Sequence, residues 1–425
     1  MSSEERGSVR PEDNLGLEQI LQVRVSQERV DRLKRLTSVD VPGGVSDEVF
    51  EFLVRQQAEW VNMQYARFLA GINFTEQDVD ELLVNAIDCH CHGGSDPMER
   101  LMLEDDIAFD YSEAGMRAIV VKTWYTPSAS RNALVQKAVN RYAEARGLRP
   151  VLCYGGIVLN YSVGGFNIEA VKKCLGFPGM KYVWMPMVDS YHHRRVVYDD
   201  WSGYGLSFLD ENRRVIPAVQ DILRLMAEHD LVLASGHYPY DDTAVLVEQA
   251  RRLGVNRIEI IHPAHIHSKH TIAQMKEQAA RGAKLMLSGL GTMAFPLHES
   301  GPLYAARIVK EVGPENLLYG SDFGQLQNFP HIVANRWMIK LLLAYGCTKE
   351  EIRTVFQETG AKLLGIEPPP PLGTAVHPGR SEKSGDDPQR YAGQPQADPR
   401  ARARAHGVFA PTPLRGPDPD GACLC

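Results

Sequence analysis

The sequence predicts an α/β protein: a (β/α)8 TIM barrel with a helical N-terminal extension and a disordered C-terminal tail. Residues 85–366 alternate short β-branched apolar runs with amphipathic helical runs, which is typical of a parallel sheet. Eight such units average about 35 residues each, which fits a closed barrel better than an open doubly wound sheet. No glycine-rich fingerprint follows the first run, and this counts against a dinucleotide-binding fold.

The composition narrows the function. The chain has 425 residues, which is enough for one large domain or two medium ones. Its 44% hydrophobic and 23% charged residues are typical of a globular protein. Its formal net charge of -7 offers no general attraction to phosphate backbones, so we expect no nucleic-acid partner. No apolar run reaches the roughly 18 residues that span a bilayer, and the polar N-terminus has no signal-peptide core. We therefore expect a cytoplasmic protein without membrane association.

Two segments differ in composition from the middle of the chain. Residues 1–84 are predicted to form a helical extension, in which an aromatic stripe at helical spacing over 46–69 precedes a capping box at Thr75 and Asp78. The stripe predicts packing on the main domain or on a second subunit, which makes a homo-oligomer through these helices one of the expected arrangements. Residues 367–425 hold 12 of the 26 prolines with almost no apolar periodicity, which predicts a disordered tail.

The barrel itself is predicted over 85–366. The expected strands are 86–92, 116–124, 149–159, 181–189, 231–237, 257–263, 283–290 and 316–323. The clearest helices between them are 133–145, 216–230, 243–254, 271–282 and 306–313. In a barrel of this kind the active site lies at the carboxyl ends of the strands, so residues at those ends are the first functional candidates.

Several strand ends carry side chains that bind metals. The first strand ends in His90, Cys91 and His92, and alternate residues of a strand point to the same face. Both imidazoles can therefore enter the barrel mouth, while Cys91 points to the helical layer. The fifth, sixth and eighth strands carry, in turn, His237, His262 and Asp322. Two or three histidines with one carboxylate are typical ligands of Zn²⁺ or a similar divalent ion, so we expect a shared metal site.

The motifs IDCHCH, ASGHYP, IIHP and YGSDFG resemble those of the amidohydrolase superfamily of metal-dependent hydrolases. The set is most similar to the amidohydrolase-related branch, which also contains nonoxidative decarboxylases and lactonases. The closing segment TKEEIRTVFQETGAKLLGI is similar to the last helix of those barrels. The resemblance covers about residues 85–366, and its motifs do not identify a substrate.

The resemblance implies roles for individual residues. It assigns His90, His92, His237 and Asp322 to the metal, with Asp322 also catalytic. It makes His262 either a further ligand or a catalytic acid/base. The cofactor is then a divalent ion, of which Zn²⁺ is favoured while Mn²⁺ and Fe²⁺ remain open.

One departure from the superfamily concerns the number of ions. Binuclear members often carry a carboxylated lysine at the mouth of the fourth strand, but here Lys181 stands at the start of that strand and its mouth has none. The simpler prediction is one ion, with Asp189 as the alternative group that would bridge a second.

Further candidates lie around the same mouth. Lys122, at the end of the second strand, is expected to bind a substrate carboxylate or oxyanion. Residues 192–195 are predicted to form a loop after the fourth strand, which either clamps an anionic substrate, with Arg194 as the binding residue, or is solvated. Three histidines that follow the sixth strand are expected to be solvated or to order their loop, with His265 as a reserve ligand; they are His265, His267 and His270.

These parts predict an enzyme. A divalent ion lowers the pKa of water and polarises a carbonyl, and a neighbouring aspartate can carry the proton. The leading hypothesis is hydrolysis of an amide, cyclic amide, lactone or similar bond of a small molecule. The alternative is nonoxidative decarboxylation of a small unsaturated or aromatic acid, with His262 or Asp322 protonating the carbon that loses CO₂. A barrel kept only as a binding module is the third hypothesis, and it would require lost ligands.

Overall fold

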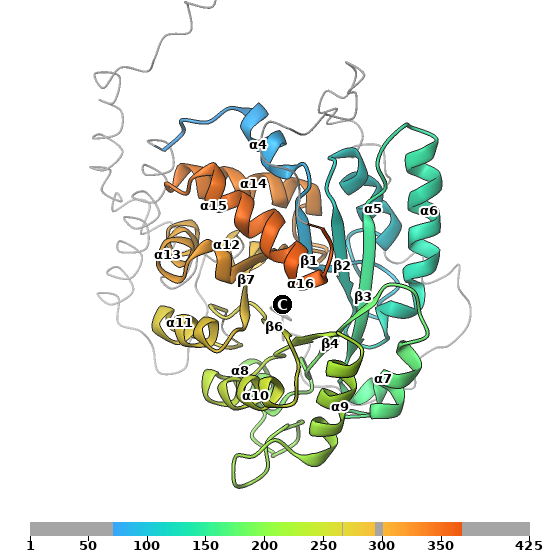
Figure 1. The fold of residues 1–425 in the computed structure, drawn as a ribbon, viewed down its shortest axis with the longest axis vertical. Helices are drawn as coiled ribbons and strands as arrows, with labels where there is room; N and C mark the ends of the chain where they lie inside the picture. Colours follow the sequence, from blue (N-terminus) through green and yellow to red (C-terminus); the bar gives the residue numbers. More distant parts are fainter. Residues whose placement is uncertain (1–70, 266, 294–300, 368–425) are drawn as a thin grey trace, which may run out of the picture. The chain divides into compact units, whose positions relative to one another are not determined.

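The computed structural model describes residues 71–265, 267–293 and 301–367. It confirms the predicted (β/α)8 barrel: eight strands follow one another around the sheet in sequence order, and every neighbouring pair from β1 to β8 is parallel. Figure 1 shows the helices placed around these strands. The expected helix over 46–69 and the tail from 368 lie outside the described residues.

Seven of the eight strands fall within the predicted runs; β4 begins one residue before its run of 181–189, and every strand is shorter than its run. They are β1 (Ile87–His92), β2 (Ala118–Lys122), β3 (Leu152–Val158), β4 (Met180–Trp184), β5 (Val232–Ala234), β6 (Arg257–Ile260), β7 (Lys284–Ser288) and β8 (Leu317–Gly320).

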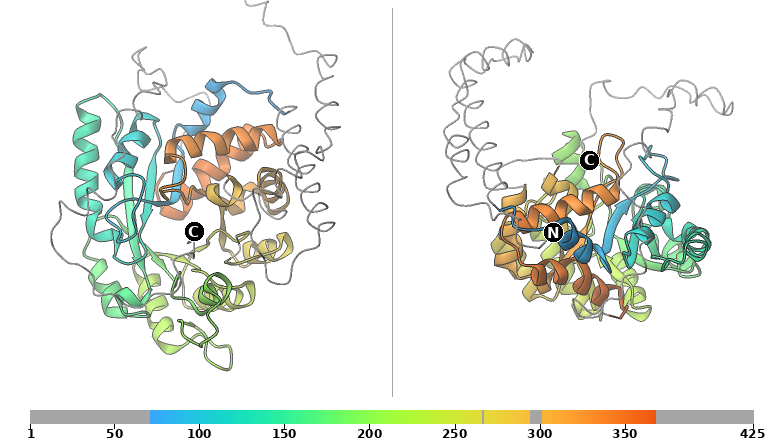
Figure 2. Two further views of the ribbon diagram at one scale, coloured as in Figure 1. Left: turned by 180° about the vertical axis from the view of Figure 1, so that it is seen from behind. Right: turned by 90° about the horizontal axis from the view of Figure 1, so that it is seen from above.

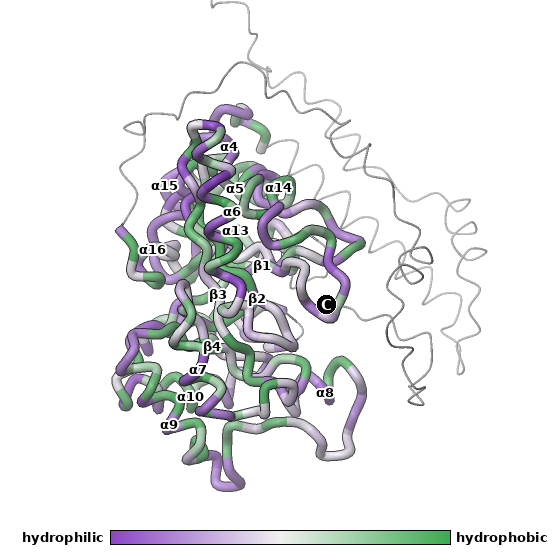
Figure 3. The backbone as a smooth tube through the Cα atoms, turned by 90° about the vertical axis from the view of Figure 1, so that its right-hand side faces the viewer, coloured by the Kyte–Doolittle hydropathy of each residue, from purple (hydrophilic) through white to green (hydrophobic). Residues whose placement is uncertain are grey.

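The helices on the outside include all five that were predicted. The barrel helices are α5 (Glu104–Glu113), α6 (Asn132–Glu144), α7 (Ile168–Cys174), α8 (Tyr191–Tyr198), α9 (Pro217–Glu228), α10 (Tyr240–Arg252), α11 (Ile272–Ala280), α12 (Gly289–Met293), α13 (Pro302–Val312) and α14 (His331–Ala344). The chain then closes with α15 (Lys349–Arg353), a π-helical turn (Thr354–Glu358) and α16 (Thr359–Leu364). Figure 3 shows hydrophobic and hydrophilic residues alternating along outer helices such as α9 and α10, as amphipathic helices require.

The short helix α4 (Glu76–Leu83) precedes the barrel and begins at the predicted capping box. The Thr75 hydroxyl accepts from the backbone N–H of Asp78, whose carboxylate accepts in return from the Thr75 N–H. Figures 1 and 2 show α4, in blue, beside the orange α14 and α15. Arg336 of α14 holds it there through ion pairs with Glu76 and Asp80.

The first and last strands meet through hydrogen bonds just beyond the end of β8. The backbone N–H of Asp322 donates to the carbonyl of His90 over 2.7 Å, and the N–H of His92 donates to the carbonyl of Phe323 over 2.8 Å. These bonds bring the end of β8 against the end of β1. The two segments with the strongest metal-binding patterns are therefore neighbours.

A register shift in β1 decides which of its side chains enter the mouth. The pairing of β1 with β2 slips between Asp88 and Cys91. Within the shift, Cys89 packs in the inner core of the barrel; just after it, Cys91 packs in the outer core between strands and helices, as predicted. The shift turns His90 and His92 towards the site, so it re-aims side chains in the way that β-bulges near active sites do.

Among the described residues, no helix is both long and apolar enough to cross a membrane.

Candidate metal centre

The structure brings three of the four predicted metal ligands together. Nε2 of His90 and Nε2 of His92 lie 3.3 Å and 3.2 Å from the same carboxylate oxygen, Oδ1 of Asp322. The three ligand atoms lie within 4.8 Å of one another, and all three residues are buried. We call His90, His92 and Asp322 the first group.

Local backbone features make this approach possible. Asp322 has a positive φ of 58°, which is uncommon for a residue other than glycine and tends to occur at functional sites. The flanking glycines leave room: a Cβ on Gly324 would lie 2.1 Å from the His92 carbonyl oxygen, and one on Gly320 would lie 2.8 Å from Cβ of His90. The sharp turn at the end of β8 is therefore made by Asp322 itself. The two glycines have no side chains and so leave space for His90 and His92.

The contacts of His92 are those of a side chain that can bind a cation in the first group. Nδ1 of His92 lies 3.1 Å from the carbonyl oxygen of Lys122, which only accepts, so Nδ1 carries the proton. Burial lowers the pKa of His92 well below its ordinary value, so the ring is neutral and Nε2 holds a lone pair. That lone pair faces the Asp322 carboxylate. Two acceptors at 3.2 Å are compatible when a cation lies between them, and this donor set suits a divalent ion.

Asp322 remains ionised in this arrangement. Burial acts to raise its pKa, but His90 and His92 can take up protons in acid, and their charge and hydrogen bonds then outweigh burial and hold the pKa of Asp322 well below its usual range. The first group thus combines two neutral imidazoles with one carboxylate.

Lys122 lies inside the site, as expected for a residue at the mouth of β2. Its side chain is almost completely buried, and Nζ lies 3.0 Å from Nε2 of His90. Burial, and then the charge of Lys122, lower the pKa of His90 to about 4. Lys122 is therefore close enough to act on any group that is bound at His90.

The fourth predicted ligand, His237, belongs to a different set of histidines. Together with His193 and His267 it forms a second group, whose ligand atoms also lie within 4.8 Å of one another. The His237 ring stacks on His267 with centroids 4.3 Å apart, and on His193 with centroids 4.9 Å apart. Its Nδ1 lies 2.8 Å from Nδ1 of His193, and its Nε2 lies 3.2 Å from Nε2 of His262.

The N-terminus of α8 fixes this second group. Ser190 is the N-cap of the helix: its hydroxyl accepts from the N–H of His193 over 3.0 Å and donates to the carbonyl of His237 over 2.7 Å. The prediction of a loop over residues 192–195 was wrong, because Ser190 caps a helix there. Since His193 is the third residue of α8, its ring turns inward and is completely buried.

His262 stands between the two groups. Its Nε2 lies 3.2 Å from Nε2 of His237, and its ring centroid lies 6.0 Å from that of His90. Its φ of 26° is also positive, so both residues predicted to be catalytic adopt unusual backbone conformations. Burial lowers the pKa of His262 well below its ordinary value, which leaves a neutral imidazole.

The structure treats the remaining candidates differently. Arg194 forms an ion pair with Asp200, with Nη2 and Oδ2 2.6 Å apart, and its guanidinium lies over the Tyr204 ring. Its charge is therefore already neutralised in this structure. Asp189 accepts from the backbone N–H of Tyr161 and lies outside both groups.

The three histidines after β6, which were expected to be solvated or to order their loop, differ most from the prediction. His267 was expected to be solvated or to order its loop, yet it is 2% exposed and belongs to the second group. His270 is also buried, but it lies 3.2 Å from the Thr243 hydroxyl, away from both groups. His265 lies beside His267 with ring centroids 4.4 Å apart. The signals that could have found the second group are the paired His192 and His193 and the alternate His265 and His267.

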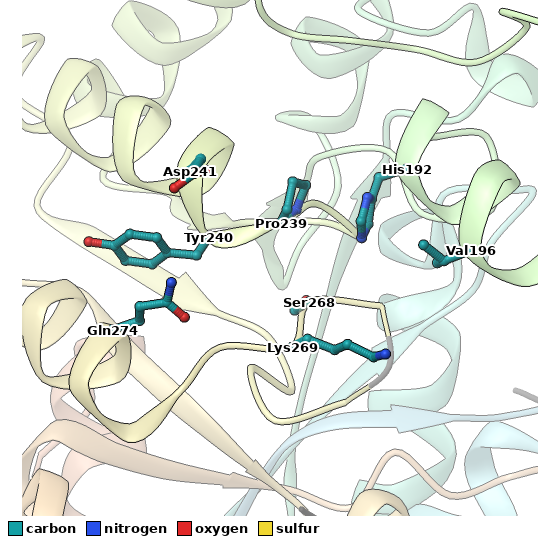
Figure 4. A pocket seen from close by; sticks show the side chains of 8 residues that line it. All are labelled: His192, Val196, Pro239, Tyr240, Asp241, Ser268, Lys269 and Gln274. Atoms are coloured by element: carbon teal, nitrogen blue, oxygen red, sulfur yellow. The ribbon is translucent and has the colours of Figure 1, made fainter.

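A pocket of about 260 Å³ lies between α8, the start of α10 and the segment after β6, and Figure 4 shows the side chains that line it. Its lining includes His192 and Ser268, the chain neighbours of His193 and His267. Figure 4 also shows Lys269 and His192 on opposite sides of it, from the segment after β6 and from α8.

The fold and the centre define a class: a TIM barrel with buried histidines and an aspartate at the carboxyl ends of its strands. A family model described as "Family of unknown function (DUF6282)" matches residues 85–286, a little under half of the chain. No curated protein matches.

Solved structures are similar to the chain at low identity. An amidohydrolase from Pseudomonas aeruginosa is 12% identical, over 68% of this chain and 98% of its own, with a TM-score of 0.45. A putative 2-pyrone-4,6-dicarboxylic acid hydrolase from Pseudomonas putida is 16% identical, over 67% and 98%, with a TM-score of 0.44. An amidohydrolase from Burkholderia multivorans with bound zinc is 13% identical, over 66% and 99%, with a TM-score of 0.43.

Proposed function

We propose that the protein is a metal-dependent hydrolase that cleaves an amide, cyclic amide, lactone or similar bond of a small molecule. One observation carries the proposal: Oδ1 of Asp322 lies 3.3 Å and 3.2 Å from Nε2 of His90 and His92, all three buried at the mouth of the barrel. Neutral imidazoles and a carboxylate that converge in this way form a divalent cation site. The sequence motifs that resemble the amidohydrolase superfamily agree with this function.

The ion is assigned to the first group, with Zn²⁺ as the favoured metal. When bound, such an ion supplies a Lewis acid that polarises a carbonyl and lowers the pKa of water. His237 was expected as a fourth ligand, but it belongs to the second group with His193 and His267. We therefore propose that His90, His92 and Asp322 hold the ion, and that His193 and His267 position His237.

The chain's own residues supply the remaining parts. Asp322 is ionised at neutral pH, so it can accept a proton from water and pass it to the leaving group. Lys122 Nζ, 3.0 Å from Nε2 of His90, can donate a hydrogen bond to a substrate oxygen. Neutral His262, between the two groups, can accept or return a proton at its nitrogen.

The experiment begins with metal analysis of purified protein. A screen of amides, cyclic amides and lactones with Zn²⁺, Mn²⁺ or Fe²⁺ loaded then identifies turnover, and the reaction is repeated in H₂¹⁸O. We expect one ¹⁸O atom in the product of each turnover. Release of CO₂ without entry of solvent oxygen would contradict hydrolysis and support the decarboxylase alternative, which no feature of residues 71–265, 267–293 and 301–367 favours.

A further inference from the structure

Arg100 is a buried cation that belongs to neither histidine group. It lies in the segment between β1 and α5, and its side chain is 0% exposed. Nη2 donates to Oδ2 of Asp96 over 3.1 Å, and the same oxygen accepts from the backbone N–H of Trp124. Within the described parts of the chain, however, Nε and Nη1 of Arg100 have no acceptor.

Unpaired donors of this kind are costly. A buried N–H without a partner costs roughly 1–3 kcal/mol, and more when the group is charged. Nε1 of the Trp124 indole, also buried, has no acceptor within the described residues either. Three N–H-bearing nitrogens on two adjacent side chains are thus left to be satisfied, and the two oxygens of a carboxylate offer about four acceptor positions.

This cluster adjoins the first group. The Arg100 guanidinium lies 5.4 Å from the centre of the Trp124 ring, and that ring lies 5.9 Å from the His92 ring. The next residue, Leu101, donates its N–H to the carbonyl of Gly324, two residues beyond Asp322.

A neighbouring arginine shows the contrast. Arg131, after β2, pairs with Glu104 through Nε and Nη2, and its Nη1 donates to the Thr126 hydroxyl. Every nitrogen of that guanidinium has an acceptor in the protein. Arg131 is therefore held for structure, whereas two nitrogens of Arg100 remain for a ligand.

We propose that Arg100 and Trp124 bind the carboxylate of a small organic acid, which places the hydrolysable bond of that acid at Asp322. The substrate class is then a carboxylate-bearing amide, cyclic amide or lactone, and this inference rests on the proposed function. Oδ1 of Asp96 is buried beside the guanidinium with no donor from the described residues, so it can accept from a hydroxyl or N–H of the same ligand.

The test uses glycolate, a small carboxylate with one hydroxyl, and glycolamide as its neutral match. Ligand-observed NMR titrations give the dissociation constant with the full chain freed of metal by chelation, so that the ion cannot bind the ligand. The variants are Arg100→Lys, which keeps a charge beside Asp96, and Arg100→Met/Asp96→Asn, which removes the pair together. Arg131→Lys is the matched control, and circular dichroism checks folding.

We expect wild-type protein and Arg131→Lys to bind glycolate with similar dissociation constants and to bind glycolamide at least about tenfold more weakly. Both Arg100 variants should weaken glycolate binding by roughly tenfold to a hundredfold, the effect of losing charged hydrogen bonds. The inference is overturned if wild-type protein does not bind glycolate, or if glycolate binds a folded Arg100→Lys variant as tightly as wild type.

The two proposals can fail separately. If glycolate binding depends on Arg100 but the protein hydrolyses no compound in the screen, the carboxylate site is supported and the proposed hydrolase function is refuted. The opposite result is that neutral amides or lactones are hydrolysed with the same kcat/KM as their carboxylate-bearing analogues. This result would support the hydrolase function and refute the carboxylate site.

Discussion

Asp322 and His90 are joined twice, once through the backbone and once through the side chains. The N–H of Asp322 donates to the His90 carbonyl over 2.7 Å, and Oδ1 of Asp322 lies 3.3 Å from Nε2 of His90. The backbone bond brings the last strand against the first, and the side-chain contact forms the core of the candidate metal centre. The same two residues therefore join the last strand to the first and bring the side chains of the candidate centre together.

The first prediction concerns the ligands and the number of ions. His90→Ala and His92→Ala should each lose the bound ion and turnover while the barrel still folds, because each removes one of only three ligands. We expect one tightly bound ion per wild-type chain by inductively coupled plasma mass spectrometry.

Two variants serve as controls for this prediction. His270→Ala removes a buried histidine outside both groups and should keep the ion. His193→Ala alters the second group and should also keep the ion. Two ions in wild type and one in His193→Ala would show that the second group binds metal, and would contradict a single-ion centre.

The second prediction separates Asp322 from the histidines. Asp322→Asn keeps the shape and one ligand oxygen, and asparagine tolerates the positive φ at this position. It should retain much of the metal but lose on the order of 10²-fold or more in kcat, the usual range for a lost general base. Asp189→Asn, outside both groups, is the control. Near-wild-type turnover of Asp322→Asn at saturating metal would leave the aspartate as a ligand only.

The third prediction concerns crowding at Gly324. A Cβ there would lie 2.1 Å from the His92 carbonyl oxygen, so Gly324→Ala must push His92 out of place. We expect loss of metal and a decrease of more than about 2 kcal/mol in the free energy of unfolding, measured in urea. Gly346→Ala is the matched control: its φ is also positive, at 88°, but nothing lies within 4 Å of the new methyl. Equal effects of the two substitutions would show that φ alone matters.

The fourth prediction concerns the pH dependence of stability. Burial raises the pKa of Glu259, in β6, from 4.5 to about 8. Between those values the folded state holds a proton that the unfolded state has released, so this residue makes stability fall as pH rises from 4.5 to 8. The total loss is at most about 5 kcal/mol.

Glu259→Gln should remove that slope. The quantity to compare is the free energy of unfolding of Glu259→Gln minus that of wild type. This difference should be more positive at pH 8 than at pH 5. Urea titrations at the two pH values measure this, and a difference that does not change with pH would contradict a protonated Glu259.

Much of the barrel could be predicted because its signals are local. The runs that form the eight strands are apolar and β-branched, and Thr75 with Asp78 caps α4 as the sequence pattern indicates. The first group was also predictable, because alternation along a strand puts His90 and His92 on one face, and barrel topology places the end of β8 beside β1.

The second group depends on contacts between distant segments. His193 turns inward because Ser190 caps α8 and at the same time bonds to the His237 carbonyl, 47 residues further along the chain. His267, in the segment that follows β6, lies against His237 with ring centroids 4.3 Å apart. The sequence alone showed histidines at these positions but did not show that their rings stack.

The sequence by itself determined the barrel, the mouth and the His90, His92 and Asp322 set, since these follow from periodicity and strand order. Only the tertiary structure decided that His237 joins His193 and His267, that Asp200 neutralises Arg194, and that Arg100 is buried with donors unpaired. The physical reason is that a side chain's charge and hydrogen-bonding state depend on which neighbours exclude water from it. Those neighbours come from segments that only folding brings together.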